Sequence, residues 1–130
     1  MFNRLFVQDA LRKSRILEEN DMVLNTKKFK NGLDGEISLL IHDIFGGEIL
    51  KTHAKKGWHF YNKINGERID FTSSDAGKEA ENFNFEDIPS TPEETNKYFE
   101  QVDYSTLFMR FVRAFEETVG LDKYRYEYTA

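Results

Sequence analysis

The chain contains no cysteine among its 130 residues. Disulfide bonds, thiolate metal ligands and a thiol nucleophile are therefore excluded. Long apolar runs are absent too, and no segment approaches the ~20 apolar residues of a membrane-spanning helix. The N-terminal stretch is broken by Asn3, Arg4, Gln8 and Asp9, so it lacks the apolar core of a signal peptide. We therefore expect a cytoplasmic protein that does not bind a membrane.

A surplus of positive charge is also missing. Lys and Arg number 18 against 23 Asp and Glu, the net charge is −5, and no long basic run occurs, so nucleic-acid binding is not expected. The hydrophobic fraction of 39% and the 12 Phe residues suffice for one compact core. The sequence predicts a single domain over residues 1–130, and no cofactor or metal is expected, because no stretch has the spacing of a known metal motif.

Residues 1–30 are predicted to hold an N-terminal helix and a connection. A helix over roughly residues 3–18 is indicated by apolar side chains at helical spacing, namely Phe2, Leu5, Phe6, Ala10 and Leu11. The polar stretch Leu17–Gly32 is typical of a long connection.

Residues 31–72 are predicted to form the core of the fold, a helix followed by a hairpin. The spacing of Ile37, Leu40, Ile41 and Ile44 predicts a helix that buries one stripe, and Gly46-Gly47 is expected to end it. Asp34 stands just before this helix, where its side chain could cap the first turn. The helix is therefore expected to begin at about Gly35.

Three strands are expected next, at Glu48–Thr52, Trp58–Ile64 and Glu67–Thr72. Asn65-Gly66 favours a type I′ turn between the last two, which fixes their register. One face should then be core and carry Trp58, Phe60, Ile64, Ile69 and Phe71. The other face should be polar and carry His59, Tyr61, Lys63, Arg68, Asp70 and Thr72. His59 and Asp70 come out one diagonal step apart, at ~7–8 Å between backbones.

The C-terminal part begins with Ser73–Pro89, which is predicted to be an acidic loop anchored by Phe83 and Phe85. Residues 91–120 are predicted to be helical. Thr91-Pro92-Glu93-Glu94 is typical of a capping box that opens a short helix. A final amphipathic helix, ended by Gly120, is indicated by Leu107, Phe108, Phe111, Val112, Phe115 and Val119. The tail with Tyr124, Tyr126 and Tyr128 is expected to be an edge strand or disordered.

The polar face of the hairpin suggests a site. An Asp that accepts one imidazole N–H fixes the orientation of the ring, as the third member of a catalytic triad does. A nucleophile for His59 would be favoured at a helix N-terminus, where the dipole lowers a thiol's pKa. Asp34 occupies that place.

The segment from Gly32 to Leu50, GLDGEISLLIHDIFGGEIL, resembles the pattern of the YunG-like proteins of bacteria. In that family a Gly-Gln-Cys stretch opens an apolar helix that ends in Gly-Gly-Glu-Ile. The resemblance continues through His59-Phe60-Tyr61-Asn62, Gly66 and Ile69-Asp70-Phe71-Thr72, and more weakly around Leu107 and Arg110, so it covers roughly residues 30–115.

The order of Cys, His and Asp in the family is similar to that of papain-like cysteine peptidases of the NlpC type. The resemblance implies an α+β fold with a papain-like core, in which a central helix packs on a small antiparallel sheet with helices at both ends of the chain. It also implies that His59 and Asp70 are catalytic positions. The family Cys falls on Asp34, and the Gln before it falls on Leu33. A carboxylate is a much poorer acyl-transfer nucleophile than a thiolate.

Several interpretations stay open at this point. For Asp34 they are an ordinary helix cap, a degenerate catalytic position and a functional carboxylate. For His59 and Asp70 they are part of a site and a structural hydrogen-bonded pair. The three together also have the residue types of a carboxylate and imidazole metal site.

Three functions follow from these interpretations. The first is an inactive or inactivated papain-like hydrolase homologue that keeps a cleft for a peptide-like or acyl ligand or a protein partner. The second is a cysteine hydrolase of amide or thioester bonds, in a parental form that has cysteine in place of Asp34. The third is a plain protein-interaction domain without a site.

Overall fold

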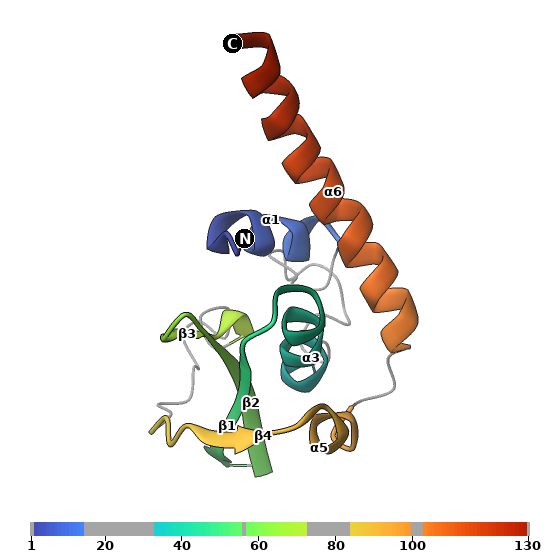
Figure 1. The fold of residues 1–130 in the computed structure, drawn as a ribbon. Coiled ribbons are helices and arrows are strands. Elements are labelled where there is room, and N and C mark those ends of the chain that lie inside the picture. Colours follow the sequence, from blue (N-terminus) through green and yellow to red (C-terminus); the bar gives the residue numbers. More distant parts are fainter. Residues whose placement is uncertain (1, 15–32, 56, 73–83, 100–102, 130) are drawn as a thin grey trace.

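The computed structural model describes residues 2–14, 33–55, 57–72, 84–99 and 103–129, with side chains up to residue 120. Figure 1 shows helices and a small sheet in a mixed α+β arrangement. In chain order the elements are α1 (Arg4–Lys13), α3 (Asp34–Phe45), β1 (Glu48–Ala54), β2 (Gly57–Ile64), β3 (Glu67–Ile69), β4 (Ile88–Ser90), α5 (Pro92–Asn96) and α6 (Tyr104–Thr129). The mixed class with an antiparallel sheet, predicted from the sequence, is confirmed.

The sheet has the strand order β3-β2-β1-β4, and all neighbours are antiparallel. The predicted hairpin register between β2 and β3 is confirmed, since Ile64 pairs with Glu67 and Asn62 with Ile69. Asn65 and Gly66 have φ values of 53° and 80°. These are the positive φ angles that a type I′ turn requires.

Two features of the sheet differ from the prediction. β3 ends at Ile69 and not at Thr72, so Asp70 lies just beyond the strand. The expected loop Ser73–Pro89 ends in a strand, because Ile88–Ser90 pairs with β1 as β4. The strand was missed because Pro89 is unusual inside a strand. Proline is nevertheless tolerated at a sheet edge, where its missing N–H removes no hydrogen bond between strands.

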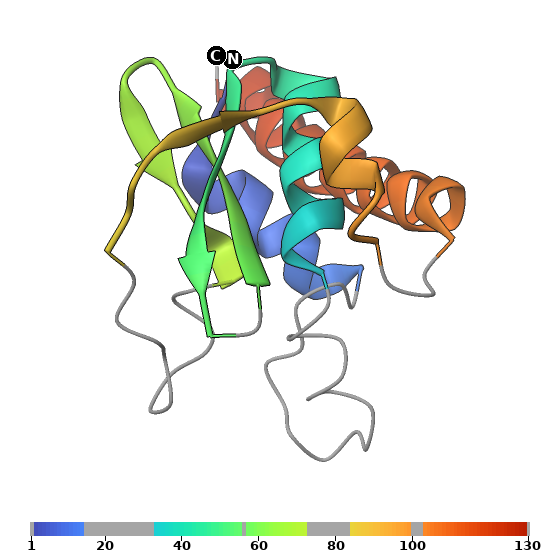
Figure 2. The same ribbon diagram turned by 90° about the horizontal axis from the view of Figure 1, so that it is seen from below.

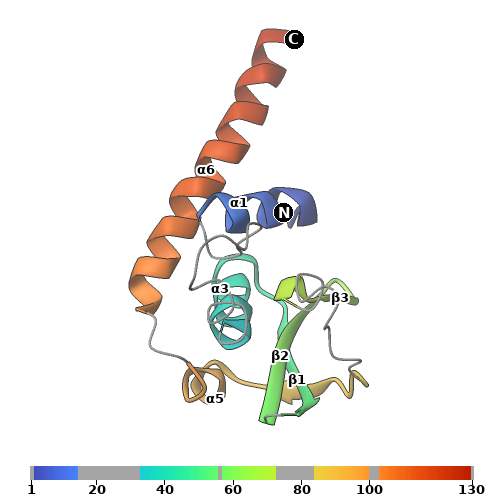
Figure 3. The same cartoon turned by 180° about the vertical axis from the view of Figure 1, so that it is seen from behind.

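Helix α3 lies between the sheet and the long helix α6, and the shorter α1 packs against α6 (Figures 1 and 3). The main core joins residues of all these layers, namely Val7, Ala10, Leu11, Leu33, Ile37, Leu40, Ile41, Ile64, Ile69, Phe71, Leu107 and Phe111. Figure 2 shows β4 leading into α5, which packs beside α3. Thr91 caps α5 as predicted, because its side chain accepts a hydrogen bond from the Glu94 N–H.

The terminal helices have other bounds than the sequence indicated. α1 ends at Lys13 instead of near residue 18, and the predicted connection Leu17–Gly32 and anchor Phe83 lie outside the described residues. α6 continues through Gly120 to Thr129, so the tail with Tyr124, Tyr126 and Tyr128 is helical. A single glycine costs a helix only ~1 kcal/mol, and no proline follows Gly120 to end it. In the described part of the chain, no helix combines the length and the apolar character needed to cross a bilayer.

Candidate functional site

Asp34 is the first residue of α3, and its side chain reaches across to β2. The N-cap is Leu33, and it makes no side-chain capping bond. Asp34 Oδ2 instead accepts a hydrogen bond from the Phe60 N–H at 2.8 Å and lies 3.6 Å from Nδ1 of His59. The prediction that Asp34 caps its own helix is therefore wrong, because a backbone N–H of the neighbouring strand holds the carboxylate.

Asp70 holds the His59 ring through its other nitrogen, Nε2. The distance from Nε2 to Asp70 Oδ2 is 2.7 Å, and Thr72 Oγ1 donates to Asp70 Oδ1 at 3.0 Å. Since an ionised carboxylate can only accept, Nε2 carries the proton of this bond. Nδ1 is the ring nitrogen that faces Asp34.

The three site residues are thus brought together in space, as the sequence predicted for His59 and Asp70. Their side chains are 18% exposed at Asp34, 10% at His59 and 7% at Asp70. Burial raises the pKa of the Asp34 carboxyl above its ordinary value, and this effect outweighs the Phe60 N–H and the His59 ring, which both lower that pKa. Asp34 therefore has a charge that its surroundings only partly compensate.

The arrangement does not suit a single metal ion. Asp34 and Asp70 lie at opposite nitrogens of one imidazole ring, so the three side chains do not point at a common centre. Within the described ranges, no group of three His, Asp or Glu residues has the spacing to hold a metal. The geometry is that of an oriented base between two carboxylates.

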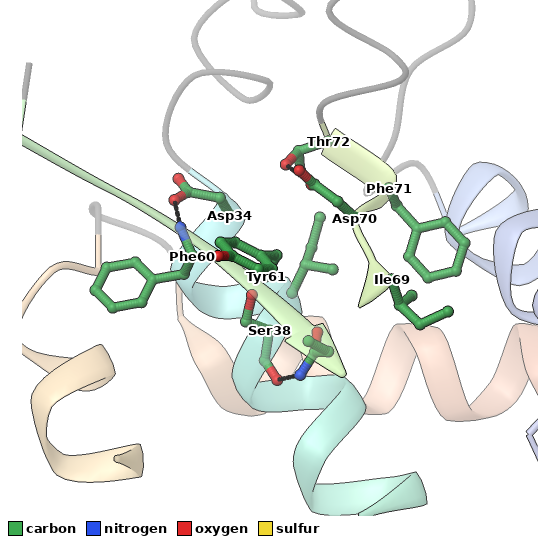
Figure 4. A pocket seen from close by; sticks show the side chains of 10 residues that line it. Asp34, Ser38, Phe60, Tyr61, Ile69, Asp70, Phe71 and Thr72 are labelled. Carbon is green, nitrogen blue, oxygen red and sulfur yellow. Dashed lines mark hydrogen bonds between the residues drawn. The ribbon is translucent and has the colours of Figure 1, made fainter. Parts of the chain in front are cut away.

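A small depression lies beside Asp34, between the start of α3, β2 and the residues after β3 (Figure 4). Its empty volume is about 170 Å³. It is lined by Asp34, Ile37, Ser38, Phe60, Tyr61, Asn62, Ile69, Asp70, Phe71 and Thr72. That volume includes open solvent, and no enclosed part of it has room for a water molecule, so the depression is shallow.

The face of the hairpin that was predicted to be polar is largely covered. Tyr61 is only 1% exposed, because Phe85 packs edge-on against its ring at 5.0 Å. The Tyr61 hydroxyl donates to Asp87 Oδ1 at 2.8 Å and accepts from the Asp87 N–H. Phe85 thus acts as the predicted anchor, and residues 85–87 close one side of the site.

Two contributions to the site were not foreseen. One is Thr72, whose hydroxyl orients Asp70. The other is Asn62, which is 2% exposed and donates to the Ser38 carbonyl at 2.9 Å, so it ties β2 to α3 beside the site. The sequence does contain a signal for this contact, since Asn62 lies on the otherwise apolar face of β2. A buried side-chain amide needs a hydrogen-bond partner.

Comparisons with known proteins agree on one family. The family model described as "YunG protein" matches residues 16–116. The protein "Uncharacterized protein YunG" of Bacillus subtilis (strain 168) is 40% identical over 82 residues, which are 63% of this chain and 69% of that protein. No solved structure matches.

Proposed function

We propose that this chain, which belongs to the YunG family, is a cytoplasmic papain-like hydrolase homologue that has lost cysteine-type acyl transfer. In this proposal Asp34 occupies the nucleophile position, and His59 and Asp70 are the retained base and its orienting acid. The site then serves to bind a peptide-like or acyl ligand or a protein partner.

One observation carries the proposal. Residue 34 opens α3 and lies 3.6 Å from His59 Nδ1, while His59 Nε2 is 2.7 Å from Asp70. A nucleophile beside a base that a third group orients is the general form of a hydrolytic triad. A merely structural His and Asp pair has no reason to face the first residue of a buried helix.

The carboxylate explains why acyl transfer is lost. Attack on an amide or thioester would give a mixed anhydride, whose carboxylate has a reference pKa of ~3.9, against ~8.5 for a thiol. The carboxylate is the better leaving group, so the tetrahedral intermediate returns to the starting state. Leu33 also stands where the family has a Gln, so a possible oxyanion donor is absent.

The depression beside Asp34 is shallow, so a peptide-like or acyl ligand would lie across its surface. Asp34, whose side chain is 18% exposed, would be the group that such a ligand meets, because Ile37, Phe60 and Ile69 are buried in the core.

The same distances favour a second candidate, a parental form with cysteine at position 34 that hydrolyses amide or thioester bonds. A thiol there would have both the start of α3 and the His59 ring to stabilise its thiolate.

Asp34→Cys tests both candidates cleanly, since it introduces the sole thiol of the chain. We expect its pKa to fall by about one unit or more from ~8.5, with faster iodoacetamide alkylation at pH 7. p-Nitrophenyl acetate should give a burst of about one equivalent of nitrophenolate with this variant and none with the unaltered chain. Adding His59→Ala should remove both effects.

Ser105→Cys is the matched control, because Ser105 is an exposed residue in the first turn of α6 and a thiol there has a helix N-terminus without a histidine. Equal reactivity of the two thiols, in variants that keep their circular dichroism, would reject the site and leave a plain interaction domain.

A further inference from the structure

We propose that residues 84–87 of this chain cover a binding face for an extended peptide, and that the ligand of the site is a peptide with an aromatic residue two positions before an aspartate. Residues 84–87 are called the strap below. The inference rests on the proposed function, because it names the peptide-like ligand and places it alongside His59.

The backbone of the strap is held by one buried hydroxyl of the sheet. Thr52 of β1 is 0% exposed. Its Oγ1 donates to the Asn84 carbonyl oxygen at 2.9 Å and accepts a hydrogen bond from the Glu86 N–H at 3.1 Å. Figure 2 shows the segment after the strap continuing into β4. Hydrogen bonds to main-chain groups do not depend on the ligand's side chains, so Thr52 suits any extended segment laid along β1.

Two side chains of the strap add specificity, and both contact the same pair of residues. Phe85 packs edge-on against the Tyr61 ring at 5.0 Å and lies under the Arg68 guanidinium, 4.3 Å from the ring centroid. Asp87 accepts a hydrogen bond from the Tyr61 hydroxyl at 2.8 Å and pairs with Arg68 at 3.3 Å. Tyr61 and Arg68 therefore select an aromatic ring followed, two residues later, by a carboxylate.

The strap has the features of a segment that opens locally. It lies outside the helices and strands, Asn84 and Glu86 are exposed, and Phe85 is only half-buried. Segments of this kind open at a small part of the free energy that unfolds the whole chain. Opening leaves the buried hydroxyls of Thr52 and Tyr61 without these partners, and a peptide of the same chemistry would replace them.

The face beneath the strap adjoins the site. Thr52 is the cross-strand partner of His59, and the Tyr61 ring is stacked near the His59 ring with centroids 6.1 Å apart. A peptide in place of the strap would therefore lie alongside His59, whose ring is also next to Asp34 and Asp70. In this structure the strap occupies that place itself.

A labelled peptide tests the inference. The probe is Asn-Phe-Glu-Asp-Ile, the sequence of residues 84–88, with fluorescein at its N-terminus and an amidated C-terminus. The control peptide has Phe and Asp exchanged, so its composition and charge are the same. Phe85→Ala combined with Asp87→Ala releases the strap in the full chain.

We expect the released variant to bind the probe, measured by fluorescence anisotropy, and to bind the control peptide at least ~10-fold more weakly. The unaltered chain should bind the probe roughly 10-fold more weakly than the released variant, because the strap competes at a high effective concentration. Adding Arg68→Gln to the released variant should weaken binding by about 5-fold, the loss of a hydrogen-bonded charge. Adding Lys97→Gln, which removes an exposed charge at the end of α5, should leave binding unchanged.

A second measurement uses the unaltered chain and does not depend on how the variant folds. The probe, at about 100 times its Kd for the released variant, should speed hydrogen exchange of the Glu86 and Asp87 amides, because it displaces the strap. The Phe60 amide, which Asp34 holds, is the internal control and should not exchange faster.

Equal binding of the two peptides, no binding to a released variant that keeps its circular dichroism, or unchanged exchange at Glu86 and Asp87 would each overturn the inference. The Asp34→Cys experiments are read separately. A reactive thiol without peptide binding would remove the ligand assignment alone, whereas peptide binding without a reactive thiol would leave a peptide-binding face and no hydrolase-like site.

Discussion

At the scale of single residues, Asp34 holds a negative charge where burial disfavours it. The Phe60 N–H and the His59 ring stabilise the ionised form, Asp70 opposes it, and burial is the largest effect. The pKa of Asp34 is therefore raised above its unfolded value near 3.8. A carboxyl of this kind contributes its full stability below the unfolded pKa and loses it as the pH rises through the folded pKa.

Asp34→Asn should consequently be more stable than the unaltered chain at pH 7. The Asn side-chain oxygen still accepts the Phe60 N–H, but it carries no charge to bury. The difference in the free energy of unfolding should shrink as the pH falls and vanish below about 3.8, where both side chains are neutral. Urea unfolding at about pH 7, 5 and 3.5 measures it.

Glu67→Gln is the control for this series, because Glu67 is exposed and its removal should change stability by less than ~0.5 kcal/mol. A less stable Asp34→Asn at pH 7 would mean that the ion pair with His59 outweighs the cost of burial.

At the scale of elements, the end of α3 fixes how the helix meets β2. Gly46 and Gly47 have φ values of 81° and 83°, in the region that favours glycine. A Cβ atom on Gly47 would lie 2.7 Å from the Lys63 carbonyl oxygen, whereas a Cβ on Gly46 would meet nothing within 4 Å. Gly47 therefore also permits the close approach of helix and strand.

Replacing either glycine by alanine should destabilise the fold, and the loss should be larger at Gly47 than at Gly46. Gly46→Ala should cost about 1–3 kcal/mol for its backbone conformation alone. Gly47→Ala should cost at least ~1 kcal/mol more, because the main chain of β2 must move away from the new methyl group. Denaturant unfolding of both variants gives the comparison, and equal losses would show that the contact with Lys63 is easily relieved.

At the scale of the whole molecule, the segment from Phe85 to β4 is fastened across the sheet by Tyr61. The Tyr61 hydroxyl makes two hydrogen bonds with Asp87, and Arg68 pairs with Asp87 while lying over the Phe85 ring at 4.3 Å. Burial raises the pKa of the Tyr61 hydroxyl, so it stays protonated and donates at any ordinary pH.

Tyr61→Phe should therefore destabilise the fold by about 1–3 kcal/mol, since it leaves the Asp87 N–H without this acceptor. Tyr104→Phe is the matched comparison, because the Tyr104 hydroxyl donates to Asp43 in an exposed bond. It should cost no more than ~1 kcal/mol. Thermal unfolding of both variants measures the difference, and a loss at Tyr61 no larger than that at Tyr104 would show that the segment is held by apolar contacts instead.

The sequence by itself determined the local features. The helical spacing of Ile37, Leu40 and Ile41 and the turn at Asn65-Gly66 are dictated by backbone angles and by periodicity over a few residues. The turn also fixed the register that brings Asp70 near His59, so this pair followed from counting along two strands. Its catalytic role, like that of Asp34, stays a prediction.

Only the tertiary structure decided the distance from Asp34 to His59. That distance depends on how α3 packs against β2, which the Asn62 bond to Ser38 and the absent side chain of Gly47 set together. The covering of Tyr61 and the pairing of β4 with β1 likewise join residues that are far apart in the chain. Such contacts depend on how the side chains of elements that are far apart in the sequence pack together, and a pattern over a few neighbouring residues cannot predict that packing.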